Sequence, residues 1–134
     1  MTELIPTDRE LEALKILWQR GETTVRDVWQ AMTAAENDLA YTTVLSLLQV
    51  MEQKGLVGHK RMGKAYAYFP KIRREPTVRK LAGGFLDKVF DGAVDEYLVH
   101  VLDSRKLNAA ELARLETMIA EARKRARPPR KKGT

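Results

Sequence analysis

Hydrophobic residues recur at helical spacing in the first part of the chain and predict two helices. The first is predicted to begin at Thr7, which can form a capping box with Glu10, and to end at Gly21. The second is predicted to follow Thr24 as its N-cap. Its apolar positions have the spacing i, i+3, i+4 and i+7 of one buried helix face: Val25, Val28, Trp29 and Met32.

The stretch AYTTVLSLLQVMEQKG, residues 40–55, predicts a third helix, which ends before Gly55. Its apolar stripe is formed by Val44, Leu47, Leu48 and Met51, with Tyr41 and Leu45 on the flank. The opposite face carries Thr42, Ser46, Gln49 and Gln53, and it has no charge before Glu52 at its edge. Solvated helix faces usually carry pairs of Lys and Glu. Two interpretations are open here: an exposed helix that is short of charge, or a face that approaches another polar surface.

After Gly55 the hydrophobic period changes from that of a helix to that of a strand. LVGHKR and AYAYF are short β-compatible runs, joined by the turn residues MGK, and they predict a β-hairpin. Its tip is basic, with Lys60, Arg61 and Lys64. The hairpin aromatics fit either a platform that stacks single-stranded bases or the inner face of the hairpin, and strand spacing beside Pro70 favours the inner face: Tyr66, Tyr68 and Phe69.

The net charge of +6 is confined to two basic blocks. Residues 1–53 have a net charge of −5, residues 54–80 of +8, residues 81–122 of −4 and residues 123–134 of +7. In a helix-turn-helix unit the second helix enters the DNA major groove, and basic residues beside it neutralise phosphates. We therefore predict a winged helix-turn-helix DNA-binding domain over residues 1–72. The other interpretation is that the basic residues only keep a hairpin edge soluble.

The segment KIRREPTVRK is predicted to be a basic connector that acts as a hinge. Beyond it, three apolar stripes at helical spacing predict three further helices, the last with Asn108 and Glu111 as a capping box. These helices, with about 45 residues, carry more apolar surface than one small subdomain can bury. We expect a helical dimerisation domain over residues 73–122, although packing against the first domain is the alternative. The predicted dimer contacts are Phe85, Val89, Val94, Tyr97, Leu98, Val101, Leu102, Leu115, Met118 and Ile119.

Residues 123–134 contain seven positive charges and two prolines, and are predicted to be a disordered basic tail. Such a tail either attracts DNA phosphates or solubilises the chain end. The chain has no cysteine and no phosphate-binding or metalloprotease motif. His59 and His100 lie far apart, and each is interpreted as structural or solvated. We therefore predict no enzyme activity, cofactor or metal. Without a signal peptide or a bilayer-length apolar run, we expect a cytoplasmic protein.

With these elements placed, the stretch YTTVLSLLQVMEQKGLVGHKRMGKAYAYFP, residues 41–70, resembles the signature of the penicillinase and methicillin-resistance repressor family, BlaI/MecI/CopY. The start PTDRELEALKILW, residues 6–18, is also typical of that family. FLDKVFDG, residues 85–92, is similar to the beginning of its dimerisation region. The resemblance extends from Pro6 to about Arg123.

The resemblance implies a winged-helix homodimer that represses transcription at an inverted-repeat operator, each protomer reading one half-site. On the matching positions, the helix residues Thr42, Thr43, Ser46 and Gln49 would face bases and nearby backbone, and Arg61 and Lys64 would face phosphates. With Tyr41 and Lys60 added, these are the predicted DNA-binding residues.

Two regulatory features of the family are not matched by the residues of this sequence. The copper-responsive branch carries a C-terminal cysteine metal site, whereas this sequence has no cysteine. The β-lactam-responsive branch is released by cleavage at an Asn-Phe bond after a membrane sensor signals. This chain has His100-Val101 at the corresponding place. A partnership with a membrane sensor-protease system and the identity of the target genes therefore stay open.

The sequence thus predicts a mainly α fold with a small β-hairpin wing and a sequence-specific transcriptional repressor that binds double-stranded DNA. Two other functions fit the same elements. One is a winged-helix module that holds a protein partner, and the other is a non-specific DNA-binding protein driven by its basic tail.

Overall fold

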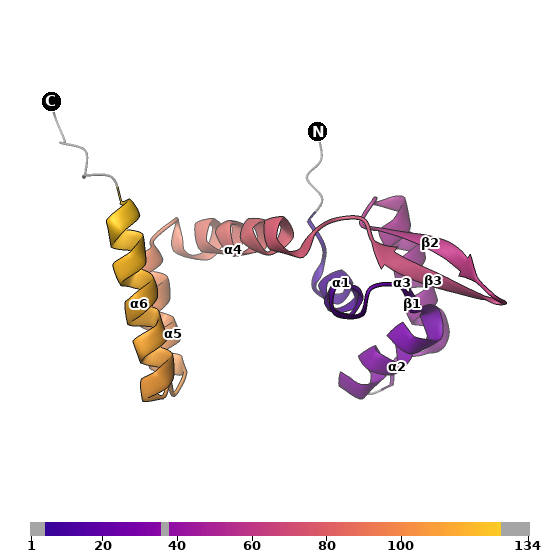
Figure 1. Cartoon of the computed structure of the whole chain (residues 1–134), viewed down its shortest axis with the longest axis horizontal. Helices are drawn as coiled ribbons and strands as arrows, with labels where there is room; N and C mark the ends of the chain where they lie inside the picture. Colours follow the sequence, from indigo (N-terminus) through magenta and orange to yellow (C-terminus); the bar gives the residue numbers. More distant parts are fainter. Residues whose placement is uncertain (1–4, 36–37, 127–134) are drawn as a thin grey trace, which may run out of the picture. The chain divides into compact units, whose positions relative to one another are not determined.

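The first part of the chain forms three helices and a small sheet around one core (Figure 1). The computed structural model describes residues 5–35 and 38–126, and it divides into two compact units, Met1–Phe85 and Leu86–Thr134. In chain order, the elements of the first unit before residue 71 are α1 (Asp8–Arg20), β1 (Thr23–Thr24), α2 (Val25–Ala35), α3 (Tyr41–Gln53), β2 (Val57–Met62) and β3 (Ala65–Pro70).

Local signals set the helix ends as predicted. The Thr7 N–H donates to Glu10 Oε1 at 2.9 Å and the Glu10 N–H donates to Thr7 Oγ1 at 3.3 Å, which confirms the first capping box. After α3, Gly55 adopts a φ of +85°. Its N–H donates to Glu52 O and the Leu56 N–H donates to Met51 O, the two bonds of a Schellman motif. This motif turns the chain directly from α3 into β2.

The predicted apolar stripes of the three helices meet in the core. Its fully buried side chains come from all three helices and from the chain entering the sheet: Leu14, Leu17, Val28, Met32, Val44, Leu48, Met51, Leu56 and Val57. Burial of each large aliphatic side chain stabilises the fold by about 1.5–3 kcal/mol. The core thus fixes which face of α3 points inward, and leaves the opposite face to solvent.

The sheet has three antiparallel strands, in the order β1-β3-β2, where the sequence predicted only a hairpin. β2 and β3 pair from Val57↔Pro70 to Met62↔Ala65, and the turn between them holds Gly63 with a φ of +63°. The added strand is only two residues long, with Thr24 opposite Ala67. Its existence depends on a partner more than 40 residues away, so no local periodicity reveals it.

The connector predicted as a hinge is mostly helical. Helix α4 (Arg74–Phe90) begins inside it. Pro76 does not prevent this, because it lies in the first helical turn, where a missing N–H costs no intrahelical hydrogen bond. The Thr77 hydroxyl is buried and donates to Arg73 O at 2.8 Å. Residues 74–80 are therefore part of a helix, and the division between the two units falls later than predicted, within α4 after Phe85.

The second unit contains the end of α4 and the helices α5 (Val94–Ser104) and α6 (Ala109–Arg125). The Glu111 N–H donates to Asn108 Oδ1 at 2.8 Å, which confirms the predicted capping box. Residues 123–125 form the last turn of α6 instead of starting a disordered tail, since positive side chains at a helix C-terminus favour the helix dipole. The rest of the predicted tail from residue 127 lies outside the described residues. Within residues 5–35 and 38–126, no helix is long and apolar enough to cross a membrane.

Candidate nucleic-acid interface

The uncharged face predicted for the third helix is exposed. Thr42, Thr43, Ser46 and Gln49 all lie on the solvent side of α3, opposite its buried residues. These side chains are hydrogen-bonding groups spread along about 10 Å of helix, at a rise of about 1.5 Å per residue. The face therefore presents donors and acceptors without a net charge before Glu52.

Tyr41 is placed at the start of this face. Its side chain is partly exposed, and its ring meets Trp29 of α2 in an edge-on contact, with 5.9 Å between centroids. The Trp29 Nε1–H donates to Leu39 O at 2.7 Å, so the indole ring is itself fixed. Tyr41 thus joins the first turn of α3 to the helix before it.

The wing presents its basic residues on two different faces. Successive strand residues alternate, so Arg61 shares one face of the sheet with His59, while Lys60 points to the other. The Arg61 guanidinium carbon lies 5.9 Å from the centroid of the Tyr66 ring, a cation–π distance. Lys60 Nζ lies 2.8 Å from Glu22 Oε2. The structure therefore does not bring Lys60 together with Arg61.

Lys64 occupies the turn at the tip of the wing. It follows Gly63 in the connection between β2 and β3, and its side chain is exposed. Across residues 5–35 and 38–126, no ion pair involves the Lys64 ammonium group. Its charge is consequently not offset by a neighbouring carboxylate, unlike that of Lys60.

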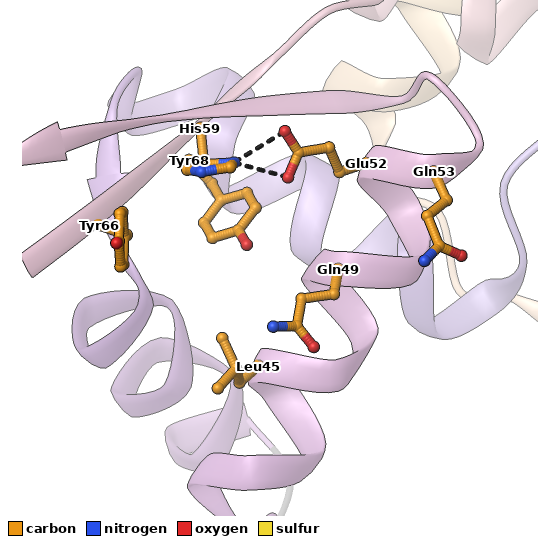
Figure 2. Close-up of a pocket in the computed structure, with 7 residues that line it drawn as sticks. All are labelled: Leu45, Gln49, Glu52, Gln53, His59, Tyr66 and Tyr68. Carbon is orange, nitrogen blue, oxygen red and sulfur yellow. Dashed lines mark hydrogen bonds and ion pairs between the residues drawn. The ribbon is translucent and has the colours of Figure 1, made fainter.

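A groove of about 590 Å³ separates α3 from the wing (Figure 2). It is lined by Leu45, Gln49, Glu52 and Gln53 from α3 and by His59, Tyr66 and Tyr68 from the sheet. Of these, only Gln49 belonged to the predicted DNA-binding residues. The inner-face prediction for the aromatics holds for Tyr68, which is buried, whereas the Tyr66 side chain is half exposed.

The groove is bridged by a hydrogen-bonded pair that the sequence did not indicate. His59 Nδ1 lies 2.6 and 2.7 Å from the two carboxylate oxygens of Glu52 (Figure 2). Burial, and then the nearby Glu52 charge, raise the pKa of the Tyr68 hydroxyl. His59 had been interpreted as structural or solvated. Its partner could be found only from the pairing of β2 with β3, which turns His59 towards α3.

Apolar side chains on the second unit remain uncovered. No residue of α5 or α6 is buried, and Met118 is 60% exposed. A groove of about 500 Å³ on this unit is lined by side chains of both helices, among them Leu98, Leu102, Leu112, Leu115, Met118 and Ile119. The other predicted dimer contacts are exposed or half-buried: Phe85, Val89, Val94, Tyr97 and Val101. His100 and Val101 lie in the middle of α5.

No group of three or more His, Asp or Glu side chains that could hold a metal ion occurs within the described ranges. The α3 and wing surface offers hydrogen-bonding groups, positive charge and aromatic rings. A helix-turn-helix formed by α2 and α3, followed by a two-stranded basic wing, defines the class of winged-helix DNA-binding proteins.

Comparison with known proteins identifies the family. The family model for the penicillinase repressor matches residues 6–121, so the chain belongs to the penicillinase repressor family of DNA-binding transcriptional repressors. It is 36% identical to the transcriptional regulator BlaI of Mycobacterium tuberculosis over 124 residues, which cover 91% of this chain and 89% of the relative. It is 22% identical to the penicillinase repressor of Bacillus licheniformis, covering 89% of this chain and 92% of the relative.

The solution structure of the DNA-binding domain of the repressor BlaI matches 55% of this chain and 90% of that domain, with a TM-score of 0.49 and 23% identity. The family match confirms the resemblance drawn from the sequence. It also places the chain among transcriptional repressors and not among enzymes.

Proposed function

We propose that this protein represses transcription by binding a specific inverted-repeat operator in double-stranded DNA as a homodimer. The observation that carries the proposal is the exposed, uncharged face of α3 beside the basic wing. Hydroxyl and amide side chains such as those of Ser46 and Gln49 match the donors and acceptors of base edges in the major groove. Membership of a repressor family supports the same function.

The wing supplies phosphate contacts in this proposal. Lys64 at its tip and Arg61 on its groove-side face would neutralise backbone phosphates, which releases counterions and makes binding salt-dependent. Lys60 would contribute less, because Glu22 already offsets its charge. Tyr41, Thr42 and Thr43 at the start of α3 would contact bases or the adjoining backbone.

The proposed homodimer is supported by the second unit. Exposed apolar side chains on α5 and α6, including Met118 and Ile119, are not buried by other residues of this unit, and such a patch is typical of an interaction site. A second copy would supply the same surface through a two-fold axis, since homodimers are usually symmetric. Two symmetric winged helices would read two half-sites in opposite orientations, which is the reason to expect an inverted repeat.

We do not extend the proposal to release by proteolysis. His100 and Val101 stand where the family resemblance places a cleavable Asn-Phe bond, and both are inside the helix α5. Since the proposed target is chromosomal DNA, the expected cytoplasmic location belongs to the same proposal.

A genome-wide selection tests the function. The purified full-length protein is incubated with genomic duplex fragments in about 150 mM salt, which suppresses weak non-specific binding to phosphates, and the captured fragments are sequenced. Recovery of a common inverted repeat is expected. Fragments with no shared sequence would instead indicate binding by charge alone, and an absence of captured DNA would favour a protein partner for α3.

A further inference from the structure

His59 lies between two of the proposed DNA contacts. On β2 it stands two residues before Arg61, on the same face of the strand. Across the groove its imidazole meets Glu52, which stands three residues after Gln49 on α3 (Figure 2). The His59–Glu52 pair therefore occupies the space between a side chain proposed to read bases and one proposed to meet phosphates.

The bond to Glu52 determines which nitrogen of the imidazole is available. An ionised carboxylate only accepts hydrogen bonds, so Nδ1 carries a proton and donates it to Glu52. Among the residues that the structure describes, Nε2 has no hydrogen-bond partner. The His59 side chain is 40% exposed. Nε2 is thus the nitrogen that can meet a ligand.

Two tyrosines of β3 hold the imidazole ring in place. The Tyr68 ring is tilted by 37° against it and the Tyr66 ring meets it edge-on at 84°, each with 5.4 Å between ring centroids. With Glu52, three neighbours constrain the ring before any ligand arrives. A contact made by a preorganised side chain loses less conformational entropy than one made by a free side chain.

We propose that His59 is a further contact to the DNA sugar-phosphate backbone, that Glu52 is its positioning residue, and that binding takes up one proton from solvent at Nε2. This inference rests on the proposed function. A phosphate oxygen is an acceptor, so a neutral imidazole would face it with the lone pair of Nε2. The protonated ring instead donates Nε2–H and forms a charge-assisted hydrogen bond.

The other charged or titratable groups around His59 come from α3, from its own strand and from β3. They are Glu52 on α3, Arg61 on the same strand, and Tyr66 and Tyr68 on β3. Carboxylates ordinarily titrate below about pH 5, and tyrosines and arginines above about pH 9, whereas histidine changes charge in between. The raised pKa of Tyr68 moves that hydroxyl further from this range.

Protonation also removes an electrostatic conflict. Glu52 is the only acidic residue on α3, and a lone carboxylate beside a DNA backbone repels phosphates. When His59 is protonated, the pair has no net charge. The neutral pair would let α3 and the wing approach the same stretch of backbone without that repulsion.

The test is the pH dependence of binding by the full-length protein to a labelled duplex that carries the recovered repeat. Between about pH 8 and about pH 6 wild-type affinity should increase, with a limiting slope of about tenfold per pH unit for each protomer that takes up one proton. His59→Gln replaces the imidazole with a polar group that does not titrate, so its affinity should be nearly constant. His100→Gln replaces the other of the two histidines and should keep the wild-type slope.

A second variant separates positioning from a purely structural role. Glu52→Leu removes both the acceptor for Nδ1–H and a negative charge near the DNA. At about pH 8 it should bind at least as tightly as wild type, while its gain in affinity towards about pH 6 should shrink. Equal loss of affinity at every pH in both His59→Gln and Glu52→Leu would mean that the pair only stabilises the fold, and would overturn the proposal.

The two proposals fail in different ways. If wild type and His59→Gln both bind the duplex with the same pH slope, the backbone contact is overturned and the repressor function stands. If wild type binds no duplex at any pH, the proposed function is overturned, and the contact with it.

Discussion

Lys54 Nζ lies 2.7 Å from Glu10 Oε2, so the end of α3 is tied to the capping box that starts α1. The Glu10 side chain is only 3% exposed, and its other oxygen accepts the Thr7 N–H. Burial by itself would raise the pKa of this carboxyl, but the hydrogen bonds from Lys54 and Thr7 outweigh it and hold the pKa below its ordinary value of 4.5. The position of α3 therefore depends on a charged carboxylate in α1.

Acid should weaken this tie. Because the folded state lowers the pKa of Glu10, its contribution to stability is complete above about pH 4.5 and is lost as the pH falls through the folded-state pKa. Glu10→Gln should lower the free energy of unfolding at about pH 7 by about 1–3 kcal/mol, and should lose less stability than wild type on acidification. Urea denaturation at neutral and acidic pH measures both effects.

Glu75→Gln is the matched control for this change. The Glu75 carboxylate is 72% exposed in its ion pair with Arg74, so its loss should change stability by at most about 1 kcal/mol. Identical acid sensitivity of wild type and Glu10→Gln would contradict the role given to the Glu10 carboxylate.

The wing tip should supply affinity without specificity. Lys64→Ala should weaken binding by a similar factor on operator and random duplexes, and should reduce the slope of log affinity against log salt by about one. Fluorescence anisotropy over a salt series gives the slope. Lys106 is an exposed lysine between α5 and α6, so Lys106→Ala is the control and should leave the salt slope unchanged. An altered sequence preference with an unchanged slope would rule out a phosphate contact.

The exposed face of α3 should supply specificity. Gln49→Ala or Ser46→Ala should cost about 1–3 kcal/mol on the preferred operator and relax the preference at one position of each half-site. Competition binding with single-base operator variants measures the preference. Gln30→Ala on the exposed side of α2 is a matched polar control. Unchanged preference in both α3 variants would refute the recognition role of this helix.

The exposed apolar residues of α6 should determine the oligomeric state. Met118→Asp and Ile119→Asp place a charge on side chains that are 60% and 53% exposed, so they should not disturb the fold but should prevent burial against a second copy. Sedimentation velocity should show a dimer for wild type and a monomer for each variant. Ala120→Asp adds the same charge outside the apolar groove that α5 and α6 line, and this variant should remain a dimer. A monomeric wild type would exclude the proposed dimer.

Local sequence signals predicted much of the fold. The capping boxes at Thr7 and Asn108 and the turn at Gly55 each depend on residues within a few positions of one another, and the structure contains all three. The buried stripe of α3 followed from helical spacing in the same way. Where a structural feature is determined by neighbours along the chain, the sequence was sufficient to predict it.

Features that depend on distant partners were missed. The strand β1 exists because Thr23 and Thr24 meet β3, and the Glu52–His59 pair exists because the register of β2 turns that histidine towards α3. The ion pair of Lys60 with Glu22 has the same origin. The start of α4 was missed for another reason, since the basic composition of the connector indicated a hinge, whereas Pro76 lies in the first turn of α4, where a proline is tolerated.

Thr24 makes two contacts that connect the wing sheet to the helix-turn-helix. It pairs with Ala67 in the wing sheet, and its hydroxyl accepts the Asp27 N–H at the start of α2. Tilting the wing would therefore disturb the start of the helix-turn-helix, so the angle between the two elements is not freely adjustable. As relatives of this chain diverge towards new operators, we expect sequence change to concentrate on outward side chains, while the frame that holds them keeps its geometry.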